Sequence, residues 1–478
     1  MDVEHAAALD PLSSGALERE LPAIRTAFDA EAMRAELQAA LVGPRGPARV
    51  RRCRPAQAIF VDGDCCVVRY ELDVEDAAGR LRPTLVTGRV YADPDRAAAY
   101  AAARLPPLLD QVRGRPEVAP FAVPAACIAR LGMVAQVFPV DGELPTLVAA
   151  TDPAVAAGVL ADLLAAGGHA DAEVLACRVE PVHYNRRHRC MSRYHLELAG
   201  GRRLVLYGKV SNDGAGARTP EVVRELRATL PGARFALPEC LGFHPGLQLV
   251  VLTEIPGVPQ VAQLLRARLR GEPAAPAGLT LEAAVDACGE IAAALHRSGL
   301  RRGAARPLAG ELARLRAELA PVRRLTPDLG ERLTRWLGRQ EAATVASDAL
   351  PLCQSHGDFT YTQLLFDGAR SGLVDFDTFC QAEPALDLGH FLAYLRFAEA
   401  KARDLSPAAA PGQLVQRLAD RFTSAYTGAG GDPAALERVP VYEALSLVRQ
   451  AAHAWQNLKG ARLRHVVTVL AERVGPAA

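Results

Sequence analysis

The sequence has few lysines and almost no excess charge of either sign. Of its 55 basic residues only three are lysines, and 54 acidic residues balance them, so the formal net charge is +1. A protein that wraps duplex nucleic acid needs a basic excess, because each phosphate contact must be neutralised. The composition therefore excludes a general nucleic-acid-binding role, and nucleic acid is not an expected partner.

Signals for secretion, disulfides and membrane spans are also missing. The first residues, 1–5, have neither the basic start nor the apolar core of a signal peptide. No uninterrupted apolar stretch approaches the roughly 20 residues that span a bilayer. The ten cysteines include no C-x-x-C pair, which at this length is typical of reduced thiols in a cytosolic protein. These absences predict a soluble cytoplasmic protein without a membrane partner.

What is present is a globular composition with an internal repeat. The chain has 478 residues and is 50% hydrophobic, which suggests two or three domains. Six residues recur at a constant offset of 124, and the order of predicted strands and helices recurs with them. We therefore predict a duplicated α+β lobe. The recurring residues are Cys53, Arg54, Cys66, Arg69, Tyr70 and Leu72, matched by Cys177, Arg178, Cys190, Arg193, Tyr194 and Leu196.

The densest chemical signal lies between residues 355 and 377. An apolar strand pair brings two acidic segments together, the first containing Asp358 and Gln363 and the second containing Asp375. Phosphoryl transfer needs a carboxylate that deprotonates the attacking hydroxyl and oxygen ligands that hold Mg²⁺ against the phosphates. This block supplies both kinds of group.

The block resembles the aminoglycoside phosphotransferase-like kinases, which phosphorylate small molecules and are related to protein kinases. Their pattern is H-G-D-x-x-x-x-N, then D-[FW]-[DE], then D-P-x-x-D-L. Here these segments read His356-Gly357-Asp358 with Gln363, Asp375-Phe376-Asp377, and Glu383-Pro384-Ala385-Leu386-Asp387-Leu388. The resemblance implies ATP and Mg²⁺ as cofactors and covers roughly residues 170 to 478.

The resemblance also implies roles for individual residues. Asp358 would be the catalytic base, and His356, counted with it as catalytic, would brace the loop. Asp375 would be the main Mg²⁺ ligand, with Gln363 and Asp377 beside it. Asp387 would be a structural carboxylate that satisfies nearby backbone groups. Gln363 departs from the usual asparagine, and although its amide oxygen can coordinate a metal, its reach differs.

The upstream half carries candidates for nucleotide binding. Lys209 lies in a predicted strand, 204–210, where such kinases place a phosphate-binding lysine. A predicted helix over 220–230 offers Glu221 and Glu225 on one face, and one of them is expected to pair with Lys209; which one stays open. By resemblance, the backbone of Thr253, Glu254 and Ile255 would hold the adenine edge.

The loop 184–189 contains no glycine where protein kinases carry a glycine-rich loop, so its arginines either assist the phosphates or form an exposed turn. The first copy of the lobe has Arg89 in place of Lys209 and no second H-G-D segment. We therefore expect a degenerate lobe that packs on, caps or dimerises the catalytic half.

The predicted fold class is α+β, a bilobal protein-kinase-like fold preceded by a degenerate duplicate of its N-lobe. The predicted domains are a degenerate lobe at 1–165, a nucleotide-binding N-lobe at 170–257 and a helical C-lobe at 258–478.

The acceptor is expected to bind among the C-terminal helices. Residues 381–478 contain nine acidic and eleven basic residues, whereas a pocket for a polycationic aminoglycoside would be rich in acid. This balance favours a neutral or anionic hydroxylated small molecule such as a sugar. Candidate contacts are Arg449, His453 and Trp455, which could equally form an ordinary amphipathic helix surface. The alternative to a kinase is a pseudokinase-like nucleotide-binding or scaffold protein without turnover.

Overall fold

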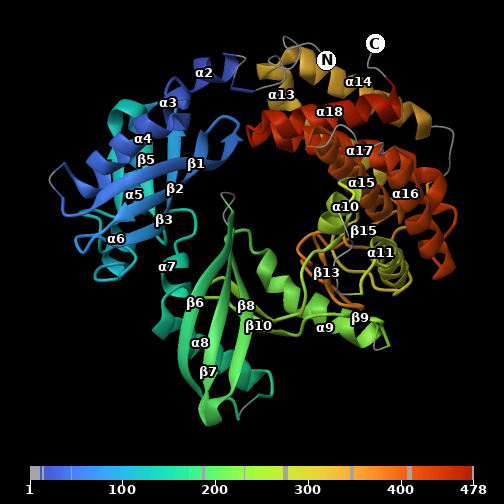
Figure 1. The fold of residues 1–478 in the computed structure, drawn as a ribbon, viewed down its shortest axis with the longest axis horizontal. Coiled ribbons are helices and arrows are strands. Elements are labelled where there is room, and N and C mark those ends of the chain that lie inside the picture. The colour runs from blue at the N-terminus through green and yellow to red at the C-terminus, as the bar shows by residue number, and fades with distance from the viewer. Residues whose placement is uncertain are drawn as a thin grey trace.

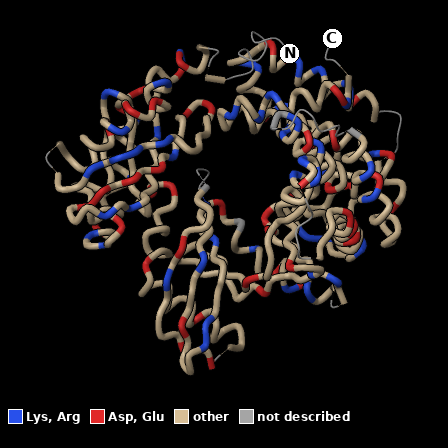
Figure 2. The backbone as a smooth tube through the Cα atoms, in the orientation of Figure 1, with Lys and Arg blue, Asp and Glu red and all other residues tan. Residues whose placement is uncertain are grey.

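The computed structural model shows three lobes that together form a ring (Figure 1). It describes residues 11–475, apart from 13–14, 45, 170, 186–188, 231, 273–277, 345–348 and 406–411. Basic and acidic residues are interspersed in every lobe (Figure 2), in keeping with the near-zero net charge. Within the described part of the chain, no helix is both long and apolar enough to cross a membrane.

The first lobe is a five-stranded antiparallel sheet with helices around it. The strand order is β1-β2-β3-β5-β4. The strands are β1 (Arg49–Val61), β2 (Cys65–Glu75), β3 (Leu81–Tyr91), β4 (Ala125–Ile128) and β5 (Met133–Val137). The helical segments are α2 (Ala16–Glu20), α3 (Ile24–Phe28), α4 (Ala30–Leu37), η1 (Gln38–Val42), α5 (Pro94–Arg104), α6 (Pro106–Gln111) and η2 (Ala129–Leu131).

The second lobe repeats this architecture. Its sheet order, read from the matching edge, is β6-β7-β8-β11-β10. The strands are β6 (Val174–Asn185), β7 (Arg189–Leu198), β8 (Arg203–Ser211), β10 (Cys240–His244) and β11 (Leu249–Thr253). The helical segments are α7 (Leu147–Ala150), α8 (Pro153–Ala166), η3 (Ala199–Gly201), η4 (Ala215–Arg218) and α9 (Thr219–Thr229).

The duplication extends to individual contacts. Tyr70 and Tyr194 are both buried and donate hydrogen bonds to the carbonyls of Ala27 and Ala150, at 2.8 and 3.0 Å. Two residues after each carbonyl, an aspartate side chain accepts two backbone N–H groups and caps the helix that precedes the sheet. The expected duplicate lobe is therefore present, and its repeat unit begins with that helix.

The position of α7 and α8 bears on the expected boundary between the first and second lobes, which the sequence placed at residue 165. Both helices contribute to the apolar core of the second sheet, which includes Leu147, Leu160 and Leu164 together with Tyr194 and Leu249. This packing favours a boundary before Leu144, because the capped helix belongs to the sheet that follows it.

One repeated position carries an aromatic residue that contacts another lobe in each copy of the repeat. Phe60 in β1 and Tyr184 in β6 each lie opposite the repeated cysteine of the next strand. The Phe60 ring lies 5.9 Å from the ring of Trp455 in the helical lobe. The Tyr184 hydroxyl donates to the carboxylate of Asp141 in the first lobe at 2.5 Å. The first lobe thus bridges the other two.

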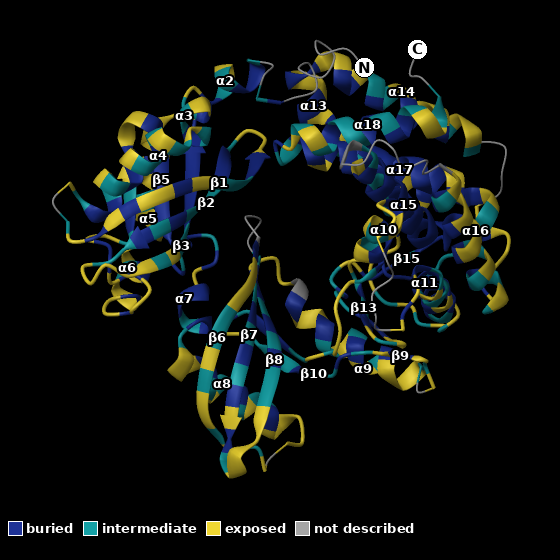
Figure 3. Cartoon of the chain, in the orientation of Figure 1, coloured by how far each residue is buried: buried dark blue, intermediate teal, exposed yellow. Residues whose placement is uncertain are grey.

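The helical lobe contains the remaining elements, with α15 and α17 at its buried centre (Figure 3). A small sheet pairs β13 with β14, and β14 with β9 from the second lobe. The helices are α10 (Val261–Leu269), α11 (Leu281–His296), α12 (Leu308–Glu318), α13 (Ala320–Leu325), α14 (Pro327–Thr344), α15 (Ala385–Leu405), α16 (Gly412–Gly428), α17 (Ala435–Gln456) and α18 (Gly460–Val474). The strands are β9 (Phe235–Ala236), β12 (Cys353–Ser355), β13 (Leu364–Asp367), β14 (Arg370–Leu373) and β15 (Cys380–Ala382).

The repeated tyrosines pack against repeated glycines, which gives a first prediction. A Cβ at Gly208 would lie 2.4 Å from the Tyr194 ring and 2.8 Å from Leu249. Gly208→Ala is therefore expected to destabilise the fold by about 1–3 kcal/mol through overpacking, measured by thermal unfolding. Gly88→Ala, whose nearest contact would be 2.9 Å, should cost less. In α14, Gly338→Ala meets nothing within 4 Å and serves as the control; equal melting temperatures for Gly208→Ala and this control would contradict the prediction.

Candidate active site

A buried carboxylate holds the loop that carries Asp358. Asp387, in the first turn of α15, accepts the backbone N–H of His356 at 2.7 Å and of Gly357 at 2.9 Å. Burial alone would raise the pKa of this carboxyl, but hydrogen bonds from His296 and the backbone hold the pKa below its ordinary value. Gly357 has φ +79°, and a Cβ there would lie 2.3 Å from the Thr378 carbonyl oxygen. This geometry agrees with the structural role expected for Asp387.

His356 connects the same loop to the second acidic segment. Its Nε2 lies 3.0 Å from the carbonyl oxygen of Val374, the residue before Asp375. The Thr378 hydroxyl donates to the His356 carbonyl at 2.9 Å, and the ring packs against Phe359, Phe376 and Phe379. His356 is fully buried, and its hydrogen bonds and ring contacts connect the loop of Asp358 to the segment that contains Asp375.

Asp358 is accessible and receives two hydrogen bonds. Oδ1 lies 2.9 Å from Nε2 of His390, and Oδ2 accepts from Nε2 of Gln363 at 3.1 Å. Burial raises the pKa of Asp358, but these contacts outweigh it and the pKa lies below its ordinary value. With 37% of its side chain exposed, the ionised carboxylate can still meet a bound hydroxyl group. Gln363 directs its amide nitrogen, rather than its oxygen, at this carboxylate.

Lys209 lies between the two aspartates of the second segment. Its Nζ donates to Oδ1 of Asp375 at 3.0 Å and also to Oδ2 of Asp377. Burial lowers the pKa of the lysine, but the two carboxylates outweigh it and raise the pKa above its ordinary value. Arg189 donates to Asp377 as well, at 3.1 Å. Asp375 has φ 67°, a left-handed backbone that is costly for a residue other than glycine and is often found at functional sites.

The expected pair between Lys209 and a glutamate of α9 is wrong. Glu225 accepts from Nε of Arg302 at 2.6 Å, and Glu221 lies 3.0 Å from Nη2 of the same arginine. One planar guanidinium binds both carboxylates because they are one helical turn apart. The lysine meanwhile is already neutralised by Asp375 and Asp377, so it has no need of an acid from the helix.

The three acceptor candidates on α17 are not gathered in one place. Trp455 is 1% exposed and packs edge-on against Phe60 of the first lobe. Arg449 donates to Glu311 at 2.6 Å, and His453 lies 3.8 Å from Glu318. Residues 449 and 453 share a helix face, whereas residue 455 does not. The expectation that Trp455 contacts the acceptor is therefore wrong, because the first lobe covers it.

The segment expected to hold the adenine follows β11 and joins the lobes. Thr253 is tied to Glu239, whose backbone carbonyl accepts the Thr253 N–H at 2.9 Å. Glu254 accepts a hydrogen bond from the Tyr207 hydroxyl at 3.4 Å. Glu254 and Ile255 come directly after the last residue of β11. The loop residues 186–188 lie outside the described residues.

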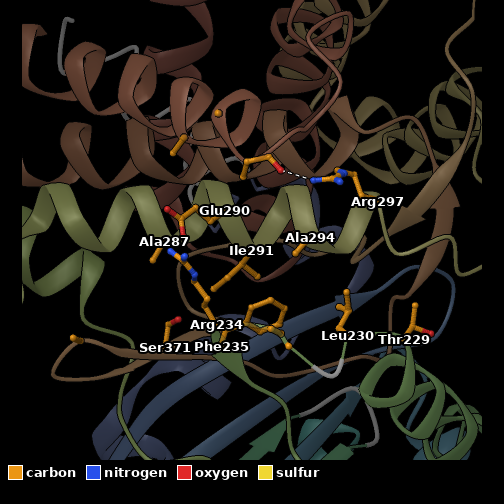
Figure 4. Close-up of a pocket in the computed structure, with 16 residues that line it drawn as sticks. Thr229, Leu230, Arg234, Phe235, Ala287, Glu290, Ile291, Ala294, Arg297 and Ser371 are labelled. Carbon is orange, nitrogen blue, oxygen red and sulfur yellow. Dashed lines mark hydrogen bonds between the residues drawn. The ribbon is translucent and has the colours of Figure 1, made fainter.

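A cavity of about 830 Å³ lies away from these carboxylates (Figure 4). It is lined by α11, by the end of α9 and by the segment around Arg234 and Phe235, with none of the predicted site residues among its walls. A smaller cavity of about 290 Å³ adjoins Asp377 and Phe376. The candidate site is the junction of the second and helical lobes, where Lys209 binds Asp375 and Asp377.

Sequence reasoning missed His390, which contacts the predicted base directly. The available signal was its spacing from Asp387. The two residues are three positions apart, so both lie on one face of α15, and Asp387 was already expected beside the catalytic loop.

The chain is similar to known proteins in both sequence and structure. A family model described as "Phosphotransferase enzyme family" matches residues 192–433, just over half of the chain. Among curated proteins no sequence matches. Similar solved structures include a glucosamine kinase in crystal form A (17% identity, 92% of this chain and 97% of that chain, TM-score 0.46). Others are a choline/ethanolamine kinase family protein from Mesorhizobium loti (16%, 63% and 92%, 0.39) and a thermostable mutant of aminoglycoside phosphotransferase APH(4)-Ia (14%, 63% and 94%, 0.42). Because the family model spans both lobes that meet at the carboxylates, the chain belongs to the phosphotransferase enzyme family.

Proposed function

We propose that the protein is an ATP-dependent kinase that phosphorylates a hydroxyl group of a small molecule, with Asp358 as the base. The observation that carries this proposal is that Lys209 of the second lobe binds both Asp375 and Asp377, and that His356 ties the loop of Asp358 to the same acidic segment. Lys209 and these two aspartates come from different lobes and lie 166 and 168 positions apart in the chain. A folded scaffold has no need of an exposed carboxylate and a charged lysine that are both tied to one acidic segment.

Each residue would have a distinct task. Asp358 would accept the proton of the acceptor hydroxyl while the acceptor oxygen bonds to the γ-phosphorus and the bond from that phosphorus to the β–γ bridging oxygen breaks. Lys209 would direct part of its charge to the nucleotide phosphates. The backbone of Thr253, Glu254 and Ile255 would bind the adenine edge.

The carboxylates also suit Mg²⁺. Among the described residues, no three His, Cys, Asp or Glu side chains form a metal cluster, but Mg²⁺ commonly takes only one or two protein carboxylates and fills its shell with phosphate and water. Asp375 and Asp377, with the amide oxygen of Gln363, would hold it. When bound, the ion would neutralise charge on the phosphates.

The acceptor would be a neutral or anionic hydroxylated metabolite such as a sugar. The balanced charge of residues 381–478 supports this class over a polycation. The test is ATP consumption by the purified protein across sugars, aminoglycosides and nucleosides, with mass spectrometry of the products and Asp358→Asn as the control. Nucleotide binding without turnover on any acceptor would favour a pseudokinase-like protein instead.

Asp375→Ala is expected to abolish Mg²⁺-dependent nucleotide binding, because it removes a charged metal ligand. Calorimetric titration of the protein with ATP in the presence and absence of Mg²⁺ measures this. Asp367→Ala, at the exposed end of strand β13, is the matched control. An unchanged affinity of Asp375→Ala for Mg²⁺·ATP would remove Asp375 from this role.

A further inference from the structure

His390 lies between the predicted base and the centre of the helical lobe. It is buried in α15, and its Nε2 is 2.9 Å from Oδ1 of Asp358. Its other ring nitrogen, Nδ1, is 2.7 Å from Oγ of Ser446 in α17. Both nitrogens are therefore engaged, and the ring lies between the loop of Asp358 and helix α17.

The charge of Asp358 determines how these hydrogen bonds run. An ionised carboxylate only accepts, so Nε2 of His390 carries the proton and donates it. In a neutral imidazole Nδ1 is then the acceptor, and the Ser446 hydroxyl donates to it. The Ser446 hydroxyl can donate as well as accept, so it holds the ring in the tautomer that the Asp358 carboxylate requires.

The two contacts on Asp358 constrain the orientation of its carboxylate. His390 holds one oxygen and Gln363 holds the other. Each carboxylate oxygen has two lone pairs, so a lone pair stays free to accept the proton of a bound hydroxyl. Misplacement of a catalytic group by about 1 Å can lower a rate by up to about 10²-fold. The hydrogen bonds that orient the Asp358 carboxylate therefore affect turnover directly.

The Ser446–His390–Asp358 series is not a hydrolytic triad. Ser446 is 3% exposed and lies within the interior of α17, where a substrate carbonyl has no access. The only exposed member is Asp358, at the end of the series. Its accessible group is therefore the carboxylate, which is the group a kinase uses.

We infer that His390 is a positioning residue that fixes the orientation of the Asp358 carboxylate for proton acceptance, and that Ser446 fixes the orientation of the His390 ring. This inference rests on the proposed function. It assigns His390 no contact with the acceptor or the nucleotide.

A matched pair of variants tests this. An asparagine amide falls near Nδ1 of the histidine it replaces and a glutamine amide near Nε2, so His390→Asn keeps only the Ser446 contact and His390→Gln only the Asp358 contact. We expect kcat to fall about 10- to 100-fold in His390→Asn, with the KM for ATP and Mg²⁺·ATP affinity unchanged. His390→Gln should recover most of kcat, and Ser446→Ala should lose a few-fold.

A double variant separates this inference from the proposed function. If His390 acts through Asp358, then His390→Asn should cost nothing further in an Asp358→Asn background. Equal loss in His390→Asn and His390→Gln, or a kcat of His390→Asn within two-fold of wild type while Asp358→Asn is inactive, would overturn the inference alone. Wild-type activity on no acceptor, or full activity of Asp358→Asn, would overturn both. Should His390→Asn fail to fold, the glutamine and Ser446→Ala variants decide, since a kcat at wild-type level in Ser446→Ala together with a large loss in His390→Gln contradicts the inference.

Discussion

Replacing Asp358 with asparagine is expected to lower turnover by about 10²- to 10⁴-fold, the usual scale for the loss of a general base. The asparagine is isosteric and still presents an oxygen to Nε2 of His390, so folding should be preserved. Nucleotide binding should also be preserved, because the expected metal ligand Asp375 and Lys209 are untouched. Steady-state kinetics on the acceptor found by the substrate panel, with calorimetry for Mg²⁺·ATP, measures both effects.

The control for this variant is a nearby carboxylate, Asp367, that lies outside the candidate site. Asp367 is the last residue of β13 and is exposed, so Asp367→Asn removes one negative charge outside the candidate site. It should leave turnover unchanged. If Asp358→Asn retained turnover within a few-fold of wild type, Asp358 would not be the base.

Lys209→Ala is expected to raise the KM for ATP or to lower kcat strongly, because it removes a charge that orients the phosphates as they react. The repeat supplies the matched control. Arg89 occupies the equivalent position in β3, as shown by the equivalent pairings of Arg89 with Val67 and of Lys209 with Met191. Arg89→Ala therefore deletes a positive charge from the same place in the other sheet.

The surroundings of Arg89 explain why its loss should differ. Arg89 is buried, donates to Asp64 at 3.3 Å and to the Tyr91 hydroxyl at 3.1 Å, and lies 4.9 Å from the centre of the Tyr100 ring. All of these partners belong to the first lobe. Its removal should lower the melting temperature and leave ATP kinetics near wild type.

Comparable kinetic losses from the two substitutions would show that the first lobe takes part in nucleotide binding. A kinetic loss confined to Arg89→Ala would show that the nucleotide binds to the first lobe rather than to the second. Kinetics and thermal unfolding measured on both variants distinguish these results.

The sequence by itself determined the features that depend on local spacing. The loop around Asp358, the acidic pair Asp375 and Asp377, and the carboxylate Asp387 were all predicted from motifs whose residues are close in the chain. Turns and helix starts of this kind impose fixed residue types at fixed offsets. The duplication was also visible, because repeated residues such as Tyr70 and Tyr194 fill the same place in two similar sheets.

Only the tertiary structure decided which side chains meet across long distances. Arg302 binds Glu221 and Glu225, so neither pairs with Lys209, and Phe60 covers Trp455 from almost 400 positions away. In a chain with 55 basic and 54 acidic residues, each charged residue has many possible ion-pair partners, and the sequence alone does not distinguish between them. The partner that wins is the one that the packing of the lobes brings within hydrogen-bond distance, because an ion pair is strong only at short range and away from water. That same packing, rather than any motif, places His390 against Asp358.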